Sequence, residues 1–282
     1  MSNTVDHLKF AGLHYPVAFI NSNSLYPYVE TILRDWGIEK YDPGDDKPPA
    51  ITICKTDAGF ERRSSWLSKP AVFDDPVDAV CDLLVDLIHA YVADNPGLLC
   101  LHCAAVEFNQ GLVVFPNSYH AGKSTLALKL VASGARLFSD DVLPISNQSN
   151  VGLALGILPR LRLPLPQGIM PNFVDFVTKR AGPQNSRYLY VKLGLNEQAV
   201  FGTAAPVRGI TILQRVDKAA ARLLEVKKTT VIKDMILRNF ARQNPGLEIV
   251  DRLCLIVENA HCHRLEYDDL DQAANLLQDA FG

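Results

Sequence analysis

The sequence has no strong excess of either charge, because 28 Lys and Arg residues are set against 31 Asp and Glu residues, giving a formal net charge of −3. It has no basic stripe, so we expect no nucleic-acid partner. Its apolar stretches are far shorter than the ~20 residues of a membrane span, so we expect no membrane partner. The first residues, MSNTVDHLKF, lack the basic start and the apolar centre of a signal peptide. These absences predict a cytoplasmic protein.

Cysteine is scarce as well, with six residues in a chain of 282. A chain of this length with 48% apolar residues can bury a sizeable core and needs no disulfide framework, which agrees with a reducing cytoplasm. Cys100 and Cys103 form a C-x-x-C pattern. Residues three apart on a strand point to opposite faces, however, and zinc sites usually need a second such pair. We therefore expect these thiols to pack in the core rather than to bind metal.

The turn signals along the chain predict two units, and no internal repeat divides it further. Residues 1–95 are expected to form a small α+β unit. Its clearest element is a helix that Asp75 and Pro76 start and that Asn95-Pro96-Gly97 stops. The other elements expected in this unit are strands at 17–20, 50–55 and 60–66 and a helix at 25–36.

Residues 96–282 are expected to form the larger unit, in which strands and helices alternate, a pattern that favours an α/β fold. A long strand at 98–108 and a short buried strand at 112–115 are expected to form a hairpin. Residues 158–166, LPRLRLPLP, contain too many prolines for a central strand. The remaining strands are expected at 135–141, 187–193, 207–213 and 261–267, and the helices at 123–134, 229–243, 246–260 and 269–281.

The stretch PNSYHAGKST, residues 116–125, matches a phosphate-binding loop except at the first position of the pattern. That pattern is Gly, four residues and Gly-Lys-[Ser/Thr] between a strand and a helix, and here Asn117 stands where the first glycine is expected. Asn is one of the few other residues that adopt positive φ at low cost, so we interpret the stretch as a relaxed loop that still binds nucleotide. A chance match in a structural loop is the alternative.

The chemistry of such a loop depends on backbone N–H groups and on a helix N-terminus that face the phosphates. Gly122 allows the backbone to approach closely, Lys123 supplies a positive charge, and the Ser124 hydroxyl can ligate Mg²⁺. The nucleotide-binding residues that we expect are Asn117, Ser118, Tyr119, His120, Ala121, Gly122, Lys123, Ser124 and Thr125.

His102 and the acid pair Asp140 and Asp141 flank this loop along the chain. The acid pair follows a predicted strand, and ligands of open α/β sheets bind where strands end. One carboxylate there can accept the proton of an attacking hydroxyl, while its neighbour holds Mg²⁺. The structural alternatives are a turn or helix cap at the acid pair and a core position for His102.

The stretch from Leu101 to Ile145 resembles the catalytic core of the HPr kinase/phosphorylase family in the order and spacing of these motifs. That family's fold is similar to the nucleotide domain of phosphoenolpyruvate carboxykinase, and its members phosphorylate a serine hydroxyl. The resemblance implies that His102 is catalytic and that Asp140 accepts the proton. It also implies that Lys123 and Ser124 bind phosphate and Mg²⁺. The alternating strands and helices that continue from there to Gly282 look like HPr-kinase-related proteins, some of which phosphorylate the precursors of lasso peptides.

The sequence departs from the family at three places. The first loop glycine is Asn117, and residues 1–95 do not resemble the N-terminal domain of full-length HPr kinases, which disfavours HPr as the substrate and the reverse phosphorolysis. The family's Glu-rich signature after the aspartates is replaced by PRLRLP, so the second Mg²⁺ ligand is unassigned, with Asp141 as our candidate. In an extended chain Arg160 and Arg162 of that segment would share one side and contact phosphate or an acidic substrate. Solvated loop arginines are the alternative.

The sequence therefore predicts an α/β protein with a P-loop nucleotide-binding core of the HPr kinase and phosphoenolpyruvate carboxykinase type, preceded by a small α+β unit. The leading hypothesis is a kinase that uses ATP and Mg²⁺ to phosphorylate a hydroxyl, with serine as the first candidate, on a peptide, a small protein or a small molecule. The alternative is a regulatory module that binds ATP but has lost the transfer step. The identity of the acceptor and the formation of a homo-oligomer stay open.

Overall fold

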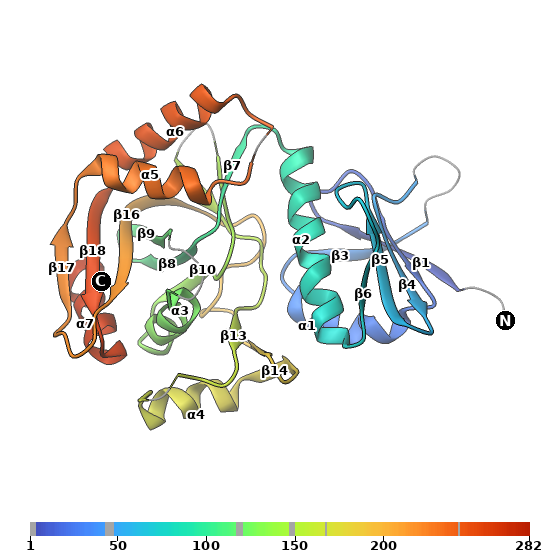
Figure 1. The fold of residues 1–282 in the computed structure, drawn as a ribbon, viewed down its shortest axis with the longest axis horizontal. Coiled ribbons are helices and arrows are strands. Elements are labelled where there is room, and N and C mark those ends of the chain that lie inside the picture. Colours follow the sequence, from blue (N-terminus) through green and yellow to red (C-terminus); the bar gives the residue numbers. More distant parts are fainter. Residues whose placement is uncertain (1–3, 43–47, 117–120, 147–149, 167, 242) are drawn as a thin grey trace.

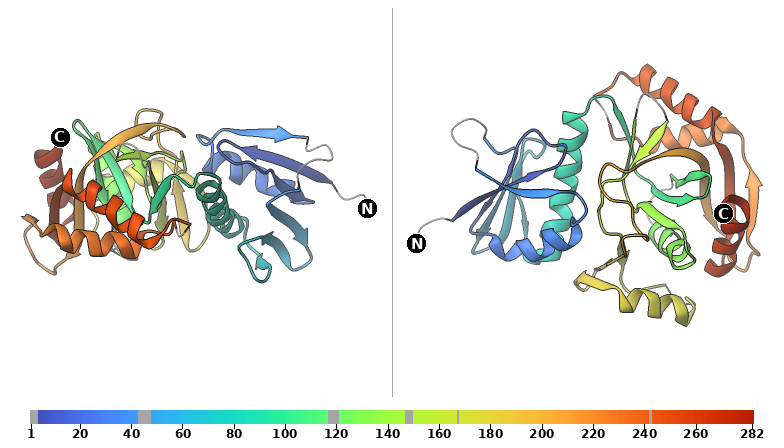
Figure 2. Two further views of the ribbon diagram at one scale, coloured as in Figure 1. Left: turned by 90° about the horizontal axis from the view of Figure 1, so that it is seen from above. Right: turned by 180° about the vertical axis from the view of Figure 1, so that it is seen from behind.

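The computed structural model describes residues 4–42, 48–116, 121–146, 150–166, 168–241 and 243–282. The fold is mixed α/β and contains several sheets. A six-stranded sheet from the N-terminal part lies at one end, a larger sheet lies at the other, and helix α2 (Pro76–Asp94) runs between them (Figure 1). The views in Figure 2 keep α2 in this intermediate position. Among the described helices, none has the length and apolar character needed to cross a lipid bilayer.

The N-terminal sheet has the strand order β3-β1-β2-β4-β5-β6. Neighbouring strands are antiparallel except β2 and β4, which are parallel. The strands predicted near 17–20, 50–55 and 60–66 are confirmed as β2, β4 and β5, whereas the other three were not expected. The strands are β1 (Val5–Phe10), β2 (Val17–Ile20), β3 (Ile38–Tyr41), β4 (Ile51–Thr56), β5 (Gly59–Ser64) and β6 (Ala71–Phe73).

The helix predicted at 25–36 is wrong in its length. A short 3-10 turn, η1 (Asn23–Leu25), leads into helix α1 (Tyr26–Ile32), and the chain has left the helix before Trp36. The Trp36 indole is fully buried and its Nε1–H donates to the carbonyl of Ala11 at 2.9 Å. Because the chain must turn to bring the indole to this position, the helix ends early.

Helix α2 has the boundaries that its sequence predicts. The Asp75 carboxylate accepts hydrogen bonds from the backbone N–H groups of Val77 and Asp78, at 2.8 Å and 3.1 Å. These bonds satisfy two of the amide groups that lack partners at a helix start. The helix ends at Asp94, one residue before the predicted Asn95-Pro96-Gly97 stop.

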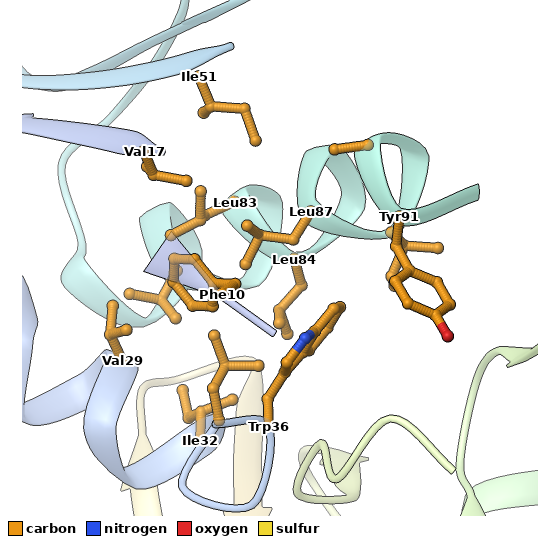
Figure 3. Packing of buried hydrophobic residues seen from close by; sticks show 14 of the residues in the cluster. Phe10, Val17, Val29, Ile32, Trp36, Ile51, Leu83, Leu84, Leu87 and Tyr91 are labelled. Carbon is orange, nitrogen blue, oxygen red and sulfur yellow. The ribbon is translucent and has the colours of Figure 1, made fainter. Parts of the chain in front are cut away.

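Helix α2 belongs to a core that extends into both halves of the chain. Figure 3 shows Leu83 and Leu87 packed near Phe10 and Trp36 of the N-terminal unit, and all four side chains are fully buried. Each such leucine contributes about 2 kcal/mol of hydrophobic stabilisation. The same cluster continues into the second half through Leu98, Leu155, Leu158 and Tyr190.

The second half of the chain builds a nine-stranded sheet with the order β10-β8-β9-β16-β12-β11-β7, and β18 pairs with both β16 and β17. Most pairs are antiparallel, while β16 runs parallel to β9 and to β18. Its strands are β7 (Leu98–Leu101), β8 (Ala104–Phe108), β9 (Gly111–Phe115), β10 (Arg136–Ser139), β11 (Leu143–Ser146), β12 (Val151–Leu153), β16 (Ala204–Arg215), β17 (Arg222–Glu225) and β18 (His261–Tyr267).

Helices cover both faces of this sheet (Figure 1). Strand β9 shows why, since Val113 and Phe115 point into one apolar cluster while Leu112 and Val114 point into another. The first cluster includes residues of α3 (Lys123–Ala132) and α7 (Leu270–Phe281), and the second includes residues of α5 (Lys228–Arg238) and α6 (Gly246–Glu258). The strands and helices predicted from 112 to 141, from 207 to 213 and from 246 to 281 are confirmed, with small shifts at their ends.

The long strand predicted at 98–108 is wrong, because the chain forms two strands there. Strand β7 pairs with β11, whereas β8 lies between β9 and β10. His102 and Cys103 connect them, so His102 is not on a strand. The His102 N–H donates to the carbonyl of Arg238 at 2.9 Å, which holds this connection in place.

A third, small sheet has the order β13-β15-β14, from β13 (Arg160–Arg162), β14 (Ala181–Gln184) and β15 (Tyr188–Val191), beside α4 (Pro171–Lys179). Strand β13 is an edge strand, as its flanking prolines predict. The helix predicted at 229–243 is too long, since α5 stops at Arg238. Beyond it, Asn239 pairs with Leu101, and the Asn239 side chain accepts a hydrogen bond from the N–H of Cys100 at 3.2 Å. These contacts to β7 replace the last helical turn.

Candidate functional site

The phosphate-loop motif lies between β9 and α3, as predicted. Helix α3 begins at Lys123, and Gly122 precedes it with a φ of +83°, a conformation that glycine adopts without strain. Ala121 to Thr125 are described, whereas Asn117, Ser118, Tyr119 and His120 lie outside the described residues. The nucleotide-binding assignment of those four residues therefore stays a prediction, and the described part is the helix start that carries Lys123 and Ser124.

Lys123 is a buried cation at the start of α3. Its side chain points toward His102, with 3.3 Å between Lys123 Nζ and His102 Nε2. Burial lowers the pKa of the Lys123 ammonium group, and the nearby carboxylate of Asp141 opposes this effect. A buried lysine with carboxylates close by keeps a charge that an anionic ligand can neutralise.

His102 connects the lysine to the acid pair. Its Nδ1 lies 3.2 Å from Asp141 Oδ1, on the side of the ring away from Lys123. Burial lowers the pKa of His102, while the Asp141 carboxylate raises it. A neutral ring with its proton on Nδ1 fits both neighbours, because it donates to Asp141 and accepts from the Lys123 ammonium group; this tautomer is assigned from the partners.

Asp140 follows β10 directly and is held by main-chain contact. Its Oδ2 accepts a hydrogen bond from the backbone N–H of Arg160 at 2.8 Å. Its Oδ1 is buried and has no hydrogen-bond partner of normal geometry among the described residues. Burial, and then the neighbouring charge of Asp141, raise the pKa of Asp140 to about 6, although the Arg160 N–H and the adjacent Ser124 hydroxyl lower it. A carboxylate with a pKa in this range can act as a general base near neutral pH.

Asp141 differs from its neighbour in exposure and in partners. Its side chain is 53% exposed and contacts His102, with Arg160 at 4.0 Å. The two acids are therefore distinct, because Asp140 is partly buried beside Ser124 and Asp141 faces solvent. This difference is compatible with a division between proton acceptor and metal ligand, which the sequence alone could not assign in detail.

The two arginines of β13 do not share a position at the site. The Arg160 side chain is partly buried, donates to Cys81 Sγ, and lies over the Tyr188 ring with 4.5 Å from Cζ to the ring centre. Arg162 is exposed on the same strand and does not line either cavity described below. Arg160 is therefore present at the acid pair, while a contact between Arg162 and phosphate or substrate stays a prediction.

Sequence reasoning missed Arg238, at the end of α5. Its carbonyl holds His102, and its positive charge lowers the pKa of both His102 and Lys123, so it lies near the centre of the site. No local motif marks it, because it reaches the site through the pairing of Asn239 with β7. The C-x-x-C thiols behave as expected: Cys100 and Cys103 are fully buried in different cores, and burial raises the pKa of Cys103 to about 12.

A cavity of about 560 Å³ opens onto the acid pair. Its walls come from α2, from the ends of β10 and α5, and from the third sheet. They include Asp78, Cys81, Leu84, Val85, Ile88, His102, Asp140, Asp141, Leu155, Leu158, Arg160, Arg187, Tyr188, Arg238 and Phe240.

A second cavity, of about 230 Å³, opens at the start of α3. It touches Gly122 and Thr125, and none of the described residues lines both cavities. Apolar and aromatic side chains form part of its wall beside a group of acids, with Ile169, Met170, Tyr267, Asp268 and Asp269 among them. The helix start and the acid pair are thus each open to a separate space.

The donor set at the site fits Mg²⁺ bound together with phosphate. Among the described residues no group of three or more His, Cys, Asp or Glu side chains could hold a metal ion on its own. Mg²⁺, however, is usually bound by one or two carboxylates and by the oxygens of its phosphate ligand. The exposed Asp141 carboxylate and the Ser124 hydroxyl provide oxygen donors of that kind.

Comparisons with known proteins reveal a remote similarity among the solved structures. No family model matches the chain, and no curated protein matches it. Among solved structures, the chain is similar to the HPr(Ser) kinase/phosphatase from Coxiella burnetii, with 13% sequence identity and a TM-score of 0.32. The match covers 64% of this chain and 95% of the Coxiella chain. A similarity this remote does not assign the chain to a family.

Proposed function

We propose that the chain is an ATP-dependent kinase that transfers the γ-phosphate to a hydroxyl group. One observation carries the proposal: His102 lies within 3.3 Å of the Lys123 ammonium group and 3.2 Å of the Asp141 carboxylate, beside Asp140. Phosphoryl transfer demands little covalent chemistry from a protein and depends mainly on positioned charges and a group that receives the proton. This cluster supplies both.

The phosphates are proposed to bind at the start of α3. Backbone N–H groups at a helix N-terminus favour anions, and Lys123 adds a full positive charge there. The smaller cavity touches Gly122 and Thr125, so the nucleoside can extend into it from the helix start. Asn117 to His120 complete the proposed nucleotide site.

Asp140 is proposed to accept the proton of the attacking hydroxyl. Its pKa of about 6 leaves it mostly ionised at neutral pH while keeping it basic enough to take a proton. The hydrogen bond from Arg160 fixes Oδ2, so Oδ1 is the oxygen that remains for the hydroxyl. His102 orients Asp141 and lies against Lys123, which makes it a positioning residue in this scheme.

Mg²⁺ is proposed to be held by Ser124 and Asp141 together with the phosphate oxygens. When bound, the ion neutralises charge on the transferring phosphate. In this proposal the protein acts in the cytoplasm on a small molecule, a peptide or a small protein, with serine as one candidate acceptor. The acceptor must reach the acid pair through the larger cavity, because that cavity is lined by Asp140 and Asp141.

The test of nucleotide binding is calorimetry with MgATP on the parent protein and on Lys123→Ala. Loss of a charge-assisted contact is worth about 1.5–3 kcal/mol, so the affinity is expected to fall roughly 10- to 150-fold. Lys179→Ala, which removes an exposed lysine at the end of α4, is the matched control and should bind MgATP normally. Equal affinity of the Lys123 variant and the parent would contradict the proposal.

A single-turnover assay separates a kinase from a regulatory module that only binds ATP. The parent protein, saturated with radiolabelled MgATP, should release ADP and pass the labelled phosphate to a hydroxyl or, more slowly, to water. Tight binding without any loss of the γ-phosphate would favour the regulatory module.

A further inference from the structure

We propose that the larger cavity is the acceptor site and that it takes a small, uncharged alcohol with an apolar or aromatic body. The predicted phosphorylation of this alcohol rests on the proposed kinase function. The predicted binding of the alcohol in the cavity is independent of that function. Of the three acceptor classes considered, a peptide, a small protein and a small molecule, it selects the small molecule. It also assigns a role to α2, which has none in nucleotide binding.

The cavity has one polar end and a long apolar wall. Asp140, Asp141 and His102 form the polar end, while Leu84, Val85 and Ile88 of α2 lie along the wall. Its volume of about 560 Å³ falls in the range of pockets that enclose small molecules. A ligand with a hydroxyl at one end and an apolar body would match both parts.

Four charged side chains of the wall, Asp78, Asp82, Arg160 and Arg187, already have ionic or polar partners. Arg187 pairs with Asp78 at 2.6 Å at the cavity rim. Asp82 is paired with Arg62 from the N-terminal sheet. Arg160 lies between Cys81, the Tyr188 ring and Asp141. A charged ligand body would have to break one of these pairs, so the wall favours a neutral one.

An extended peptide is disfavoured, because main-chain groups at both sheet edges beside the site already have hydrogen-bond partners. At the β13 edge, the Arg160 N–H is taken by Asp140. At the β7 edge, the N–H of Cys100 donates to the Asn239 side chain, and its carbonyl accepts from the N–H of Phe240 at 3.0 Å. Peptides that bind at sheet edges obtain their affinity from such main-chain groups.

The reaction follows from this placement. The acceptor oxygen forms a bond to the γ-phosphorus, and the bond from that phosphorus to the bridging oxygen of ATP breaks. The bridging oxygen keeps the electron pair and leaves as part of ADP, and the hydroxyl proton passes to Asp140. Because the described residues that line one cavity do not line the other, nucleotide and acceptor can approach the phosphorus from different sides.

The probe for the experiment is 2-(2-naphthyl)ethanol, which carries one primary hydroxyl on an apolar bicyclic aromatic group. Val85 and Ala93 are the two exposed residues of α2, but only Val85 lines the cavity. Val85→Trp and Val85→Asp should therefore weaken probe binding at least tenfold, one by bulk and the other by charge. Ala93→Trp and Ala93→Asp are matched controls that should bind the probe like the parent. Fluorescence titration measures the binding, and MgATP affinity should be the same in all five proteins.

Equal probe affinity in the Val85 and Ala93 variants would overturn the cavity assignment. Tighter binding of the serine peptide acetyl-Gly-Ser-Gly-amide, with the same sensitivity to Val85, would overturn the choice of a small apolar alcohol. Chromatography of the probe after incubation with radiolabelled MgATP tests the transfer, which should require Asp140 and decrease in the Val85 variants. Binding that depends on Val85 but leads to no phosphorylated probe would support the ligand class and count against the proposed kinase.

Discussion

The carboxylate of Asp140 accepts a hydrogen bond from the backbone N–H of Arg160 at 2.8 Å, and this contact joins the end of β10 to the start of β13. The bond fixes one carboxylate oxygen and leaves the other, Oδ1, buried without a partner of normal geometry among the residues that the structure describes. A buried carboxylate oxygen of this kind lowers the stability of the folded protein unless it binds a ligand or a proton. Because this oxygen lies at the polar end of the larger cavity, substitution of Asp140 tests its role directly.

Asp140→Asn should leave MgATP binding almost unchanged and slow phosphate transfer by about 10²–10⁴-fold. The side chains have nearly the same shape, so the hydrogen bond from Arg160 to the side-chain oxygen can be kept while the proton acceptor is lost. Single-turnover transfer and calorimetry on the same preparation check both parts. Transfer at the parent rate would show that Asp140 is not the base.

The raised pKa of Asp140 predicts a dependence of stability on pH. Its folded-state pKa of about 6 exceeds the ordinary 3.8, so the folded protein holds the proton more strongly than the unfolded chain. The stability gained from this proton is complete below about pH 4 and is lost as the pH rises through 6. Asp140→Asn should therefore be more stable than the parent at pH 8, by roughly 3 kcal/mol, and equal to it near pH 4. Urea unfolding of both proteins at the two pH values measures the difference, and equal stability at pH 8 would contradict the raised pKa.

Asp141→Asn should raise the Mg²⁺ concentration needed for half-maximal transfer, because it removes a charged oxygen donor from the exposed side of the site. Its effect at saturating Mg²⁺ should be much smaller than that of Asp140→Asn. Titrations of Mg²⁺ at fixed ATP separate the two acids. If Asp140→Asn alone shifted the Mg²⁺ requirement, the proposed roles of the neighbouring acids would have to be exchanged.

Asp75→Ala should lower the free energy of unfolding by about 0.5–2 kcal/mol, because it removes the cap of α2. Asp75 also accepts a hydrogen bond from the Asn185 side chain at 2.9 Å, which links the helix start to the third sheet. Asp74→Ala, at the exposed preceding residue, is the control and should change stability little. Denaturant unfolding of the three proteins checks the prediction, which fails if the two variants are equally stable.

Local patterns predicted the elements next to the candidate site well. The sequence around Lys123 has a buried strand before it and a helix after it, and the structure contains both as β9 and α3. The acid pair follows β10 as expected, and the proline-rich segment forms an edge strand. These successes share a cause, since each depends on residues that are close together in the chain.

The errors occur where distant segments compete for the same backbone groups. The break at His102 and the early end of α5 result from one set of contacts, in which Asn239 bonds to the end of β7 and the Arg238 carbonyl accepts from His102. Neither segment contains a signal for the other. For the same reason, spacing and composition could not predict that Arg238 lies at the site. They could not predict either that α2 lines the larger cavity.

The position of α2 has a consequence for how the molecule loses its structure. Its leucines lie in one apolar cluster with side chains from both halves of the chain, so neither half can expose its side of the helix without uncovering the other. Heating should therefore melt the two sheets together in one calorimetric transition, rather than as two independently unfolding bodies. A chain shortened to begin after this helix would lack part of the core that supports the candidate site.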